Sequence, residues 1–267
     1  MNDRPIGVFD SGLGGLTVVR ALIDLLPDER IVYFGDTDRF PYGSKPAEAV
    51  LAYSHQIADV LLGHEIKALV VACNSAAAAA LDALRARLDI PVVGVIEPGL
   101  QAAARATQSG RIGVIATVGT IASGAYQQIA ARHGDDVDLT CAACPGFVEF
   151  VEAGDIDSDQ VHVLAERLLA PVRDAQVDTL VLGCTHYPLL ARTIGDVMGR
   201  DVVLVSSADE TAFVVRDLLT AHGLQASAGP SDARHVFFTS GAVDTFRTLG
   251  VRFLGPEVAT VESWQWG

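Results

Sequence analysis

The stretch VLGCTHYPLL, residues 181–190, decides the fold. It continues an apolar run, 179–182, of the kind that forms a buried parallel strand, and a glycine ends that run. A cysteine, Cys184, follows at once, and Pro188 is well placed for the first turn of a helix. Open α/β sheets hold their chemistry at the carboxyl ends of strands, and a helix N-terminus favours a thiolate. The stretch therefore predicts a reactive cysteine at the end of a parallel strand.

A second stretch, LVVACNSA at residues 69–76, aligns without a gap with LVLGCTHY at 180–187. Cys73 takes the place of Cys184, and polar residues follow it as well. A single cysteine in this position is often only a small buried hydrophobic residue. Two cysteines in matching contexts favour paired chemistry.

Composition limits the classes of function. The chain has 267 residues with 50% hydrophobic and 19% charged residues, which is ample material for one or two cores. Its net charge of -14 argues against nucleic acid and anionic membranes as main partners, although backbone N–H groups can still bind a small anion. Four cysteines do not make a disulfide scaffold, and neither a signal peptide nor a membrane span is evident. We expect a cytoplasmic protein with reduced thiols and no membrane partner.

Strands that alternate with helices predict an α/β architecture with parallel sheets. The pattern restarts near residue 111, where IGVIATVGT (112–120) parallels IGVFDSGLG (6–14). We interpret this as an internal duplication, in which the two strand-end cysteines face each other across one cleft. The expected strands include 6–9, 31–34, 67–72, 91–96, 179–182, 202–205 and, as the last, 236–239.

Other motifs carry weaker signals. The glycine-rich turn after Asp10 lacks the dinucleotide spacing, and anion binding and tight packing both stay open for it. The pair Cys141 and Cys144 has the spacing of a redox or zinc half-site, but two further zinc ligands are not evident, so we expect a structural role and no metal. Neither Lys45 nor Lys67 lies in a Schiff-base setting, so we expect no pyridoxal cofactor.

Two facing thiols suit inversion at a carbon atom, since a thiolate on one face removes a proton while a thiol on the other supplies one. A free cysteine titrates near 8.5, and helix ends or basic neighbours lower its pKa toward cellular pH. We expect His186 and Asp10 to set the protonation of the two cysteines. Neutral donors for a carboxylate are Ser11, Asn74, Ser75 and Thr185.

Five segments, FDSGLGGLTV, YFGDTDRFPYGSK, VVACNSA, IGVIATVGT and LVLGCTHYP, resemble the sequential motifs of the cofactor-independent glutamate racemases of the aspartate/glutamate racemase superfamily. The resemblance implies two similar parallel-sheet α/β domains, related by a pseudo-twofold duplication, with the active site in the cleft between them. The first domain would comprise 1–97 plus 207–267, and the second 98–206. Within the family pattern, Ser75 replaces a more frequent threonine, Glu149 a common proline, and Cys141 is unusual.

The resemblance also implies the activity: interconversion of L- and D-glutamate without a cofactor, supplying D-glutamate for peptidoglycan and cell shape, often as a homodimer. Cys73 and Cys184 would be the acid/base pair, with Asp10 near Cys73 and with His186 and Glu152 near Cys184. By the family's handedness, Cys73 deprotonates D-glutamate and Cys184 deprotonates L-glutamate. The implied substrate contacts are Asp10, Ser11, Tyr42, Gly43, Asn74, Ser75, Thr117, Thr120, Thr185 and His186.

Two alternatives stay open. One is an aspartate or hydantoin racemase of the same superfamily, against which the segment at 33–45 favours glutamate by resemblance. The other is a non-catalytic α/β module that binds an anion. The matched cysteines argue against the second alternative.

Overall fold

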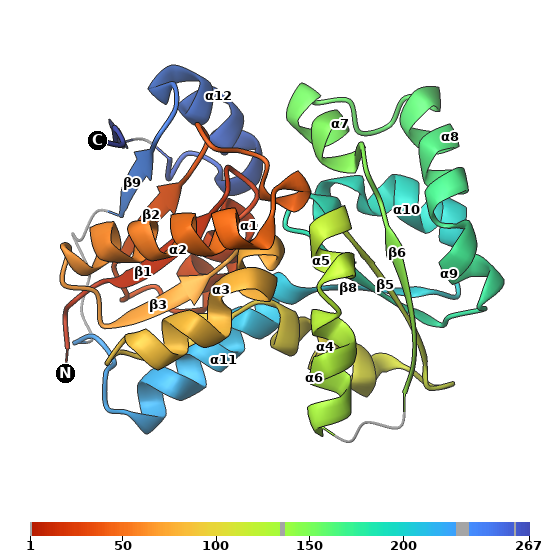
Figure 1. Cartoon of the computed structure of the whole chain (residues 1–267), viewed down its shortest axis with the longest axis horizontal. Helices are drawn as coiled ribbons and strands as arrows, with labels where there is room; N and C mark the ends of the chain where they lie inside the picture. Colours follow the sequence, from red (N-terminus) through yellow and green to blue (C-terminus); the bar gives the residue numbers. More distant parts are fainter. Residues whose placement is uncertain (1, 134–136, 228–234, 259) are drawn as a thin grey trace.

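Two parallel sheets, each covered by helices, form two lobes that lie side by side (Figure 1). This computed structural model describes residues 2–133, 137–227, 235–258 and 260–267. The first sheet has the order β10-β9-β2-β1-β3-β4 and the second β6-β5-β7-β8, and all pairs are parallel. The strands of the first sheet are β1 (Ile6–Asp10), β2 (Ile31–Gly35), β3 (Ala68–Val71), β4 (Val92–Gly94), β9 (Val236–Thr239) and β10 (Val261–Ser263). Those of the second are β5 (Arg111–Ala116), β6 (Asp138–Ala143), β7 (Thr179–Gly183) and β8 (Val203–Ser206).

The central strands form from continuous apolar runs, because helices cover both faces of a parallel sheet. Every residue of β1, β2, β3 and β7 is buried, whereas the edge strands β6 and β8 are partly exposed and more polar. The register aligns the carboxyl ends: Asp10 pairs with Gly35, and Ala116 with Gly183. Each sheet therefore presents the residues after its strands at one edge.

The helices of the first lobe are α1 (Leu16–Leu25), α2 (Ala47–Leu62), α3 (Asn74–Arg87), α11 (Ser207–Ala221) and α12 (Val243–Leu254). Those of the second are α5 (Val118–Ala122), α6 (Ala125–His133), α7 (Phe147–Ala153), α8 (Asp159–Leu168), α9 (Ala170–Asp174) and α10 (Ala191–Met198). Short 3₁₀ turns span Tyr42–Ser44 (η1) and Tyr187–Leu190 (η2).

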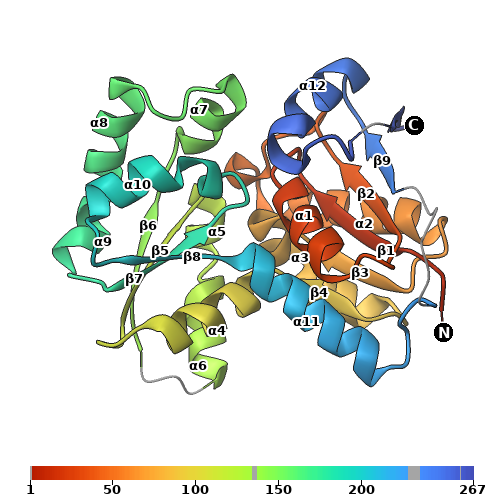
Figure 2. The same ribbon diagram turned by 180° about the vertical axis from the view of Figure 1, so that it is seen from behind.

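The chain crosses between the lobes twice, through α4 (Ile96–Ala106) and from β8 into α11 (Figure 2). The two crossings touch, because a Cβ on Gly99 of α4 would lie 2.9 Å from the Cβ of Ser207. These positions lie next to the predicted domain boundaries at 97 and 206, which stay a prediction.

The observed topology confirms the parallel two-sheet architecture and its duplication. The order β2-β1-β3-β4 in the first sheet repeats as β6-β5-β7-β8 in the second, so corresponding strands occupy corresponding places. The expected strands are present, but β4 is shorter than 91–96 because α4 already begins at Ile96.

Three local expectations were wrong. The half-exposed strand β6 was not predicted, and β10 follows the strand that was expected to be last. Pro188 lies in the first turn of a helix as expected, but this helix is the 3₁₀ turn η2, which begins at Tyr187, and α10 begins only at Ala191. Cys184 therefore does not cap an α-helix.

Candidate active site

Cys73 lies between the end of β3 and the start of α3, as the apolar run and the polar residues after it predicted. Its sulfur accepts the N–H of Ala76 at 3.5 Å and lies 3.7 Å from the hydroxyl oxygen of Ser11. The residue is 6% exposed. It is the N-cap of α3, which is the position where a helix stabilises negative charge.

Asp10, the last residue of β1, forms a hydrogen bond between the two lobes. Its carboxylate is fully buried and accepts the N–H of Gly12 at 2.9 Å. It also accepts the hydroxyl of Thr185, from the second lobe, at 3.4 Å. Burial raises the pKa of this carboxyl group, while His186 and the N–H of Gly12 act against the rise.

Cys184 follows β7 and has a different neighbour, the ring of His186. The Sγ of Cys184 lies 3.9 Å from Nδ1 of His186, and the other ring nitrogen lies 2.7 Å from Oε1 of Glu152 on α7. Two rings from the first lobe, Phe40 and Phe253 of α12, each pack against the imidazole at a centroid distance of 5.8 Å. The histidine is thus held between the thiol and a carboxylate.

These surroundings raise the pKa values of both His186 and Cys73. Burial opposes the charge on His186, but Cys184 and Glu152 together raise its pKa to about 10, so the ring is an imidazolium at neutral pH. Burial, with the charge of Asp10 added, raises the pKa of Cys73 to about 12, although the Ala76 N–H and Ser11 act against this. The expectation that a helix end lowers this pKa is therefore wrong for Cys73, because desolvation outweighs the helix N-terminus.

A cluster of hydroxyl groups closes one side of the site. Ser75 lies within hydrogen-bond distance of Thr117 and Thr120, at 3.0 and 3.1 Å, and these two lie 3.0 Å apart. Next to it, the amide nitrogen of Asn74 donates to the hydroxyl of Tyr126 at 3.1 Å. The Oδ1 of Asn74 is buried and has no hydrogen-bond partner among the residues that the structure describes.

A cavity lies between the lobes, and residues from each of these groups line it. It is small, about 20 Å³, which is room for about one water molecule. The loop at Gly43 lies against the second lobe so closely that a Cβ there would come within 2.5 Å of Thr117. The site is therefore closed. The lining residues are Ser11, Pro41, Tyr42, Gly43, Cys73, Asn74, Ser75, Thr117, Val148, Cys184, Thr185 and His186.

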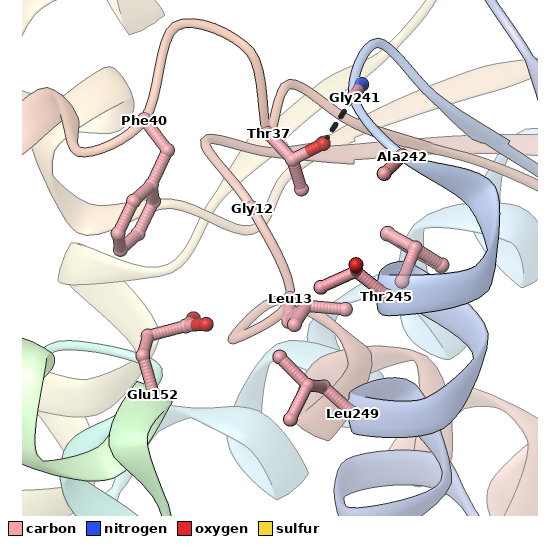
Figure 3. Close-up of a pocket in the computed structure, with 10 residues that line it drawn as sticks. Gly12, Leu13, Thr37, Phe40, Glu152, Gly241, Ala242, Thr245 and Leu249 are labelled. Carbon is pink, nitrogen blue, oxygen red and sulfur yellow. Dashed lines mark hydrogen bonds between the residues drawn. The ribbon is translucent and has the colours of Figure 1, made fainter.

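On the outer side of Glu152 lies a wider cavity of about 220 Å³, which α12 borders (Figure 3). Its walls include Leu13, Phe40 and Leu249, and the carboxylate of Glu152 points into it. Glu152 thus borders the wider cavity, while the buried ring of His186 lines the closed one.

The structure brings the sequence-predicted site residues together at the cleft. Two predicted substrate contacts do not line the cavity: Thr120 lies behind Ser75, and Asp10 accepts a hydrogen bond from Thr185. Pro41 and Val148 in the wall were not predicted from the sequence. Three aromatic contacts were not predicted either: Phe40 lies inside the segment 33–45, whereas Tyr126 and Phe253 have no local sequence signal.

The remaining cysteines lie beside the site. The carbonyl oxygen of Cys144 accepts the hydroxyl of Tyr187 at 3.1 Å, and Cys141 in β6 receives a hydrogen bond from Gln127. Both thiols are free. Within the described ranges, no group of three or more His, Cys, Asp and Glu side chains is placed to hold a metal ion. Nor does any helix in that part of the chain have the length and apolarity needed to cross a membrane.

Comparison with known proteins gives the family of the chain and relatives of the same fold. Residues 6–213 match the model of the Asp/Glu/Hydantoin racemase family. A glutamate racemase of Geobacter metallireducens is 49% identical over 258 residues, which cover 97% of this chain and 95% of that protein. The crystal structure of a glutamate racemase from Bacillus anthracis superimposes with a TM-score of 0.93 at 41% identity, covering 100% of this chain and 98% of that one. That of Francisella tularensis, in complex with D-glutamate, gives 0.91 at 34%, covering 99% and 98%.

Proposed function

The chain belongs to the Asp/Glu/Hydantoin racemase family and is an amino-acid racemase, and on that premise we propose that it interconverts L- and D-glutamate with Cys73 and Cys184 as its two bases. One observation carries the proposal. The two thiols follow equivalent strands of the two duplicated sheets and line one closed cavity. Their charged neighbours have opposite signs, Asp10 beside Cys73 and His186 beside Cys184.

These neighbours suggest how the protons are held. Cys184, beside the imidazolium of His186, acts as the base toward L-glutamate, whereas burial and Asp10 keep Cys73 a thiol. In the L-to-D direction, Cys184 takes the α-proton of L-glutamate, and Cys73 gives its own proton to the opposite face of the carbon. The reverse direction starts from the opposite protonation of the pair, so one proton is taken and one is given in each turnover.

The polar groups of the cavity match a substrate that carries carboxylate and ammonium groups. Hydroxyls of Ser75 and Thr117 are donors for a carboxylate, and the unpartnered Oδ1 of Asn74 is an acceptor for the ammonium group. A hydrogen-bonded, water-poor site makes such contacts strong. On this basis we propose as substrate contacts the predicted residues that line the cavity, with Asp10 and Thr120 supporting them from behind: Ser11, Tyr42, Gly43, Asn74, Ser75, Thr117, Thr185 and His186.

Circular dichroism of separate L- and D-glutamate solutions tests the activity. We expect the signal to decay to zero from both directions with no cofactor added. Cys73→Ala and Cys184→Ala should each abolish the decay, while Cys141→Ala, a change of the same chemistry in β6, should keep it. Decay with aspartate and not glutamate would make the chain an aspartate racemase, and no decay with either would end the assignment.

Exchange of the α-proton in D₂O tests the two roles separately. Each single variant retains one base on one face, so it should still exchange the proton of one enantiomer without inverting it. We expect Cys184→Ala to exchange D-glutamate and Cys73→Ala to exchange L-glutamate. The opposite pairing would reverse the assigned handedness and leave the two-base scheme intact.

The resemblance to glutamate racemases supports three further proposals. The enzyme works in the cytoplasm, forms a homodimer, and supplies D-glutamate for peptidoglycan. Depletion of the enzyme should be relieved by D-glutamate in the medium, and light scattering should give twice the mass of one chain.

A further inference from the structure

A buried carboxylate next to the site collects four side-chain donors from distant parts of the chain. Asp36 follows β2 and is fully buried. It accepts Nε of Arg39 at 2.7 Å, the hydroxyl of Tyr42, the hydroxyl of Ser240 at 2.8 Å, and Nε1 of Trp266 at 3.1 Å. A buried carboxylate needs such donors, because an unpaired charge in the interior is costly.

Trp266 contributes more than one hydrogen bond to this group. Its ring lies over the guanidinium of Arg39, with Cζ 3.7 Å from the ring centroid, and it packs on Phe34 at a centroid distance of 5.4 Å. The opposite face of the guanidinium lies over Tyr53, 4.1 Å from that centroid. Arg39 is therefore clamped between two aromatic rings, and Trp266 supplies one of them.

The residues that Asp36 holds form a wall of the active site. Tyr42 is 1% exposed, and it lines the cavity together with Pro41 and Gly43. Its hydroxyl points to Asp36, so the carboxylate fixes η1 from behind. A loop that must meet a small substrate tightly depends on such support.

We propose that Trp266 is a positioning residue for the substrate: through Asp36 and Arg39 it holds the Pro41–Gly43 wall against the cavity. The inference deepens the proposed function and rests on it for its kinetic readout. Trp266 itself does not line the cavity.

The neighbouring Trp264 provides a matched control. It belongs to the same aromatic cluster, with its ring 6.2 Å from that of Trp266, and its buried Nε1 has no hydrogen-bond partner within the described residues. Trp266→Phe and Trp264→Phe therefore make the same chemical change, but only the first removes a donor from Asp36.

Steady-state kinetics should separate the two variants. We expect Trp266→Phe to raise KM for both enantiomers about 3- to 10-fold with kcat within about twofold, because the loss of a wall weakens ground state and transition state alike. Trp264→Phe should leave both constants within about twofold. Trp266→Leu, which also removes the ring over Arg39, should raise KM further. Equal effects of the two phenylalanine variants would overturn the proposal.

Hydrogen exchange provides a readout that needs no substrate. Amides of residues 39–45 should exchange faster in Trp266→Phe than in Trp264→Phe, at a temperature where both remain folded in thermal melts. If the wild type leaves glutamate unchanged, the proposed function falls, and this comparison still decides the role of Trp266. Equal exchange in the two variants would rule that role out.

Discussion

Nε2 of His186 lies 2.7 Å from Oε1 of Glu152, while Nδ1 of the same ring faces Cys184 at 3.9 Å. The imidazole thus links a carboxylate that borders an open cavity to a thiol in a closed one. A proton held on this ring keeps a positive charge beside Cys184, and Cys184 and Glu152 together raise the pKa that holds the proton there.

Glu152→Gln keeps the shape of the side chain and removes its charge. We expect kcat/KM to fall roughly 10- to 100-fold, the effect of about 1.5–3 kcal/mol for a hydrogen bond to a charged group. The fall must be equal in both directions, because the two enantiomers have the same free energy in water. The pKa of His186 falls as well, so the alkaline limb of the rate profile should move to lower pH.

The same helix offers the control for this prediction. Glu149 is exposed on α7, and Glu149→Gln should leave the rate within about twofold of wild type. Similar losses in both variants, or an alkaline limb that stays in place in Glu152→Gln, would contradict the role given to Glu152.

Asp10→Asn tests the charge beside Cys73. Burial is the larger cause of the raised pKa, so removal of the carboxylate charge should lower the pKa of Cys73 only part of the way from about 12. The rate of alkylation by iodoacetamide against pH, read by mass spectrometry in a Cys184→Ala background, measures it. Cys144, whose pKa burial raises to about 12, is an internal control and should keep its profile. An unchanged Cys73 profile would refute the influence of Asp10.

Gly14→Ala should reduce activity strongly, because the added methyl group would collide with His186 and Thr185. A Cβ at Gly14 would lie 2.5 Å from Nδ1 of His186 and would also meet the hydroxyl of Thr185. We expect a loss of kcat/KM of about 100-fold or more as the ring is displaced. Gly195→Ala in α10 is the control, because its Cβ would find Leu204 only at 3.8 Å. That variant should stay active and gain up to about 1 kcal/mol in stability, and an active Gly14→Ala enzyme would show that the ring tolerates displacement.

Protein stability should depend on pH through His186. The folded protein holds this proton up to about pH 10, whereas an unfolded histidine releases it near 6.5. The stabilisation is therefore complete below pH 6.5 and is lost as pH rises toward 10, at most about 1.4 kcal/mol per pH unit. Urea unfolding of wild type and His186→Asn across this window measures the difference. A difference in unfolding free energy that is constant with pH would contradict the raised pKa.

Much of the site could be predicted from sequence because its signals are local. Buried parallel strands are continuous apolar runs, so Cys73 and Cys184 could be placed at strand ends from a few neighbouring residues each. The repeated pattern then predicted that both would face one cleft. Strand β6 was not predicted because it lies at the edge of the sheet and is half exposed. Its polar residues interrupt the apolar run that marks a buried strand.

The features of the site that could not be predicted from the sequence depend on packing between distant segments of the chain. Phe253 and Tyr126 contact His186 and Asn74 only because the lobes close, and neither has a local signature. The raised pKa of Cys73 could not be predicted for the same reason. The helix N-terminus that lowers it can be seen in the sequence, but the burial that raises it cannot. The local sequence pattern thus predicted where the reactive side chains lie, whereas burial in the folded protein determines their pKa values.

The repeated strand order bears on how the enzyme arose. A single-lobe ancestor that paired with itself would have offered identical thiols to the two faces of one carbon atom. Fusion of two such copies would have allowed each to diverge. Asp10 now has Ala116 as its counterpart, and His186 has Ser75. At these pairs the twofold symmetry is broken, so that the two halves differ in charge while the enzyme acts on both enantiomers of its substrate.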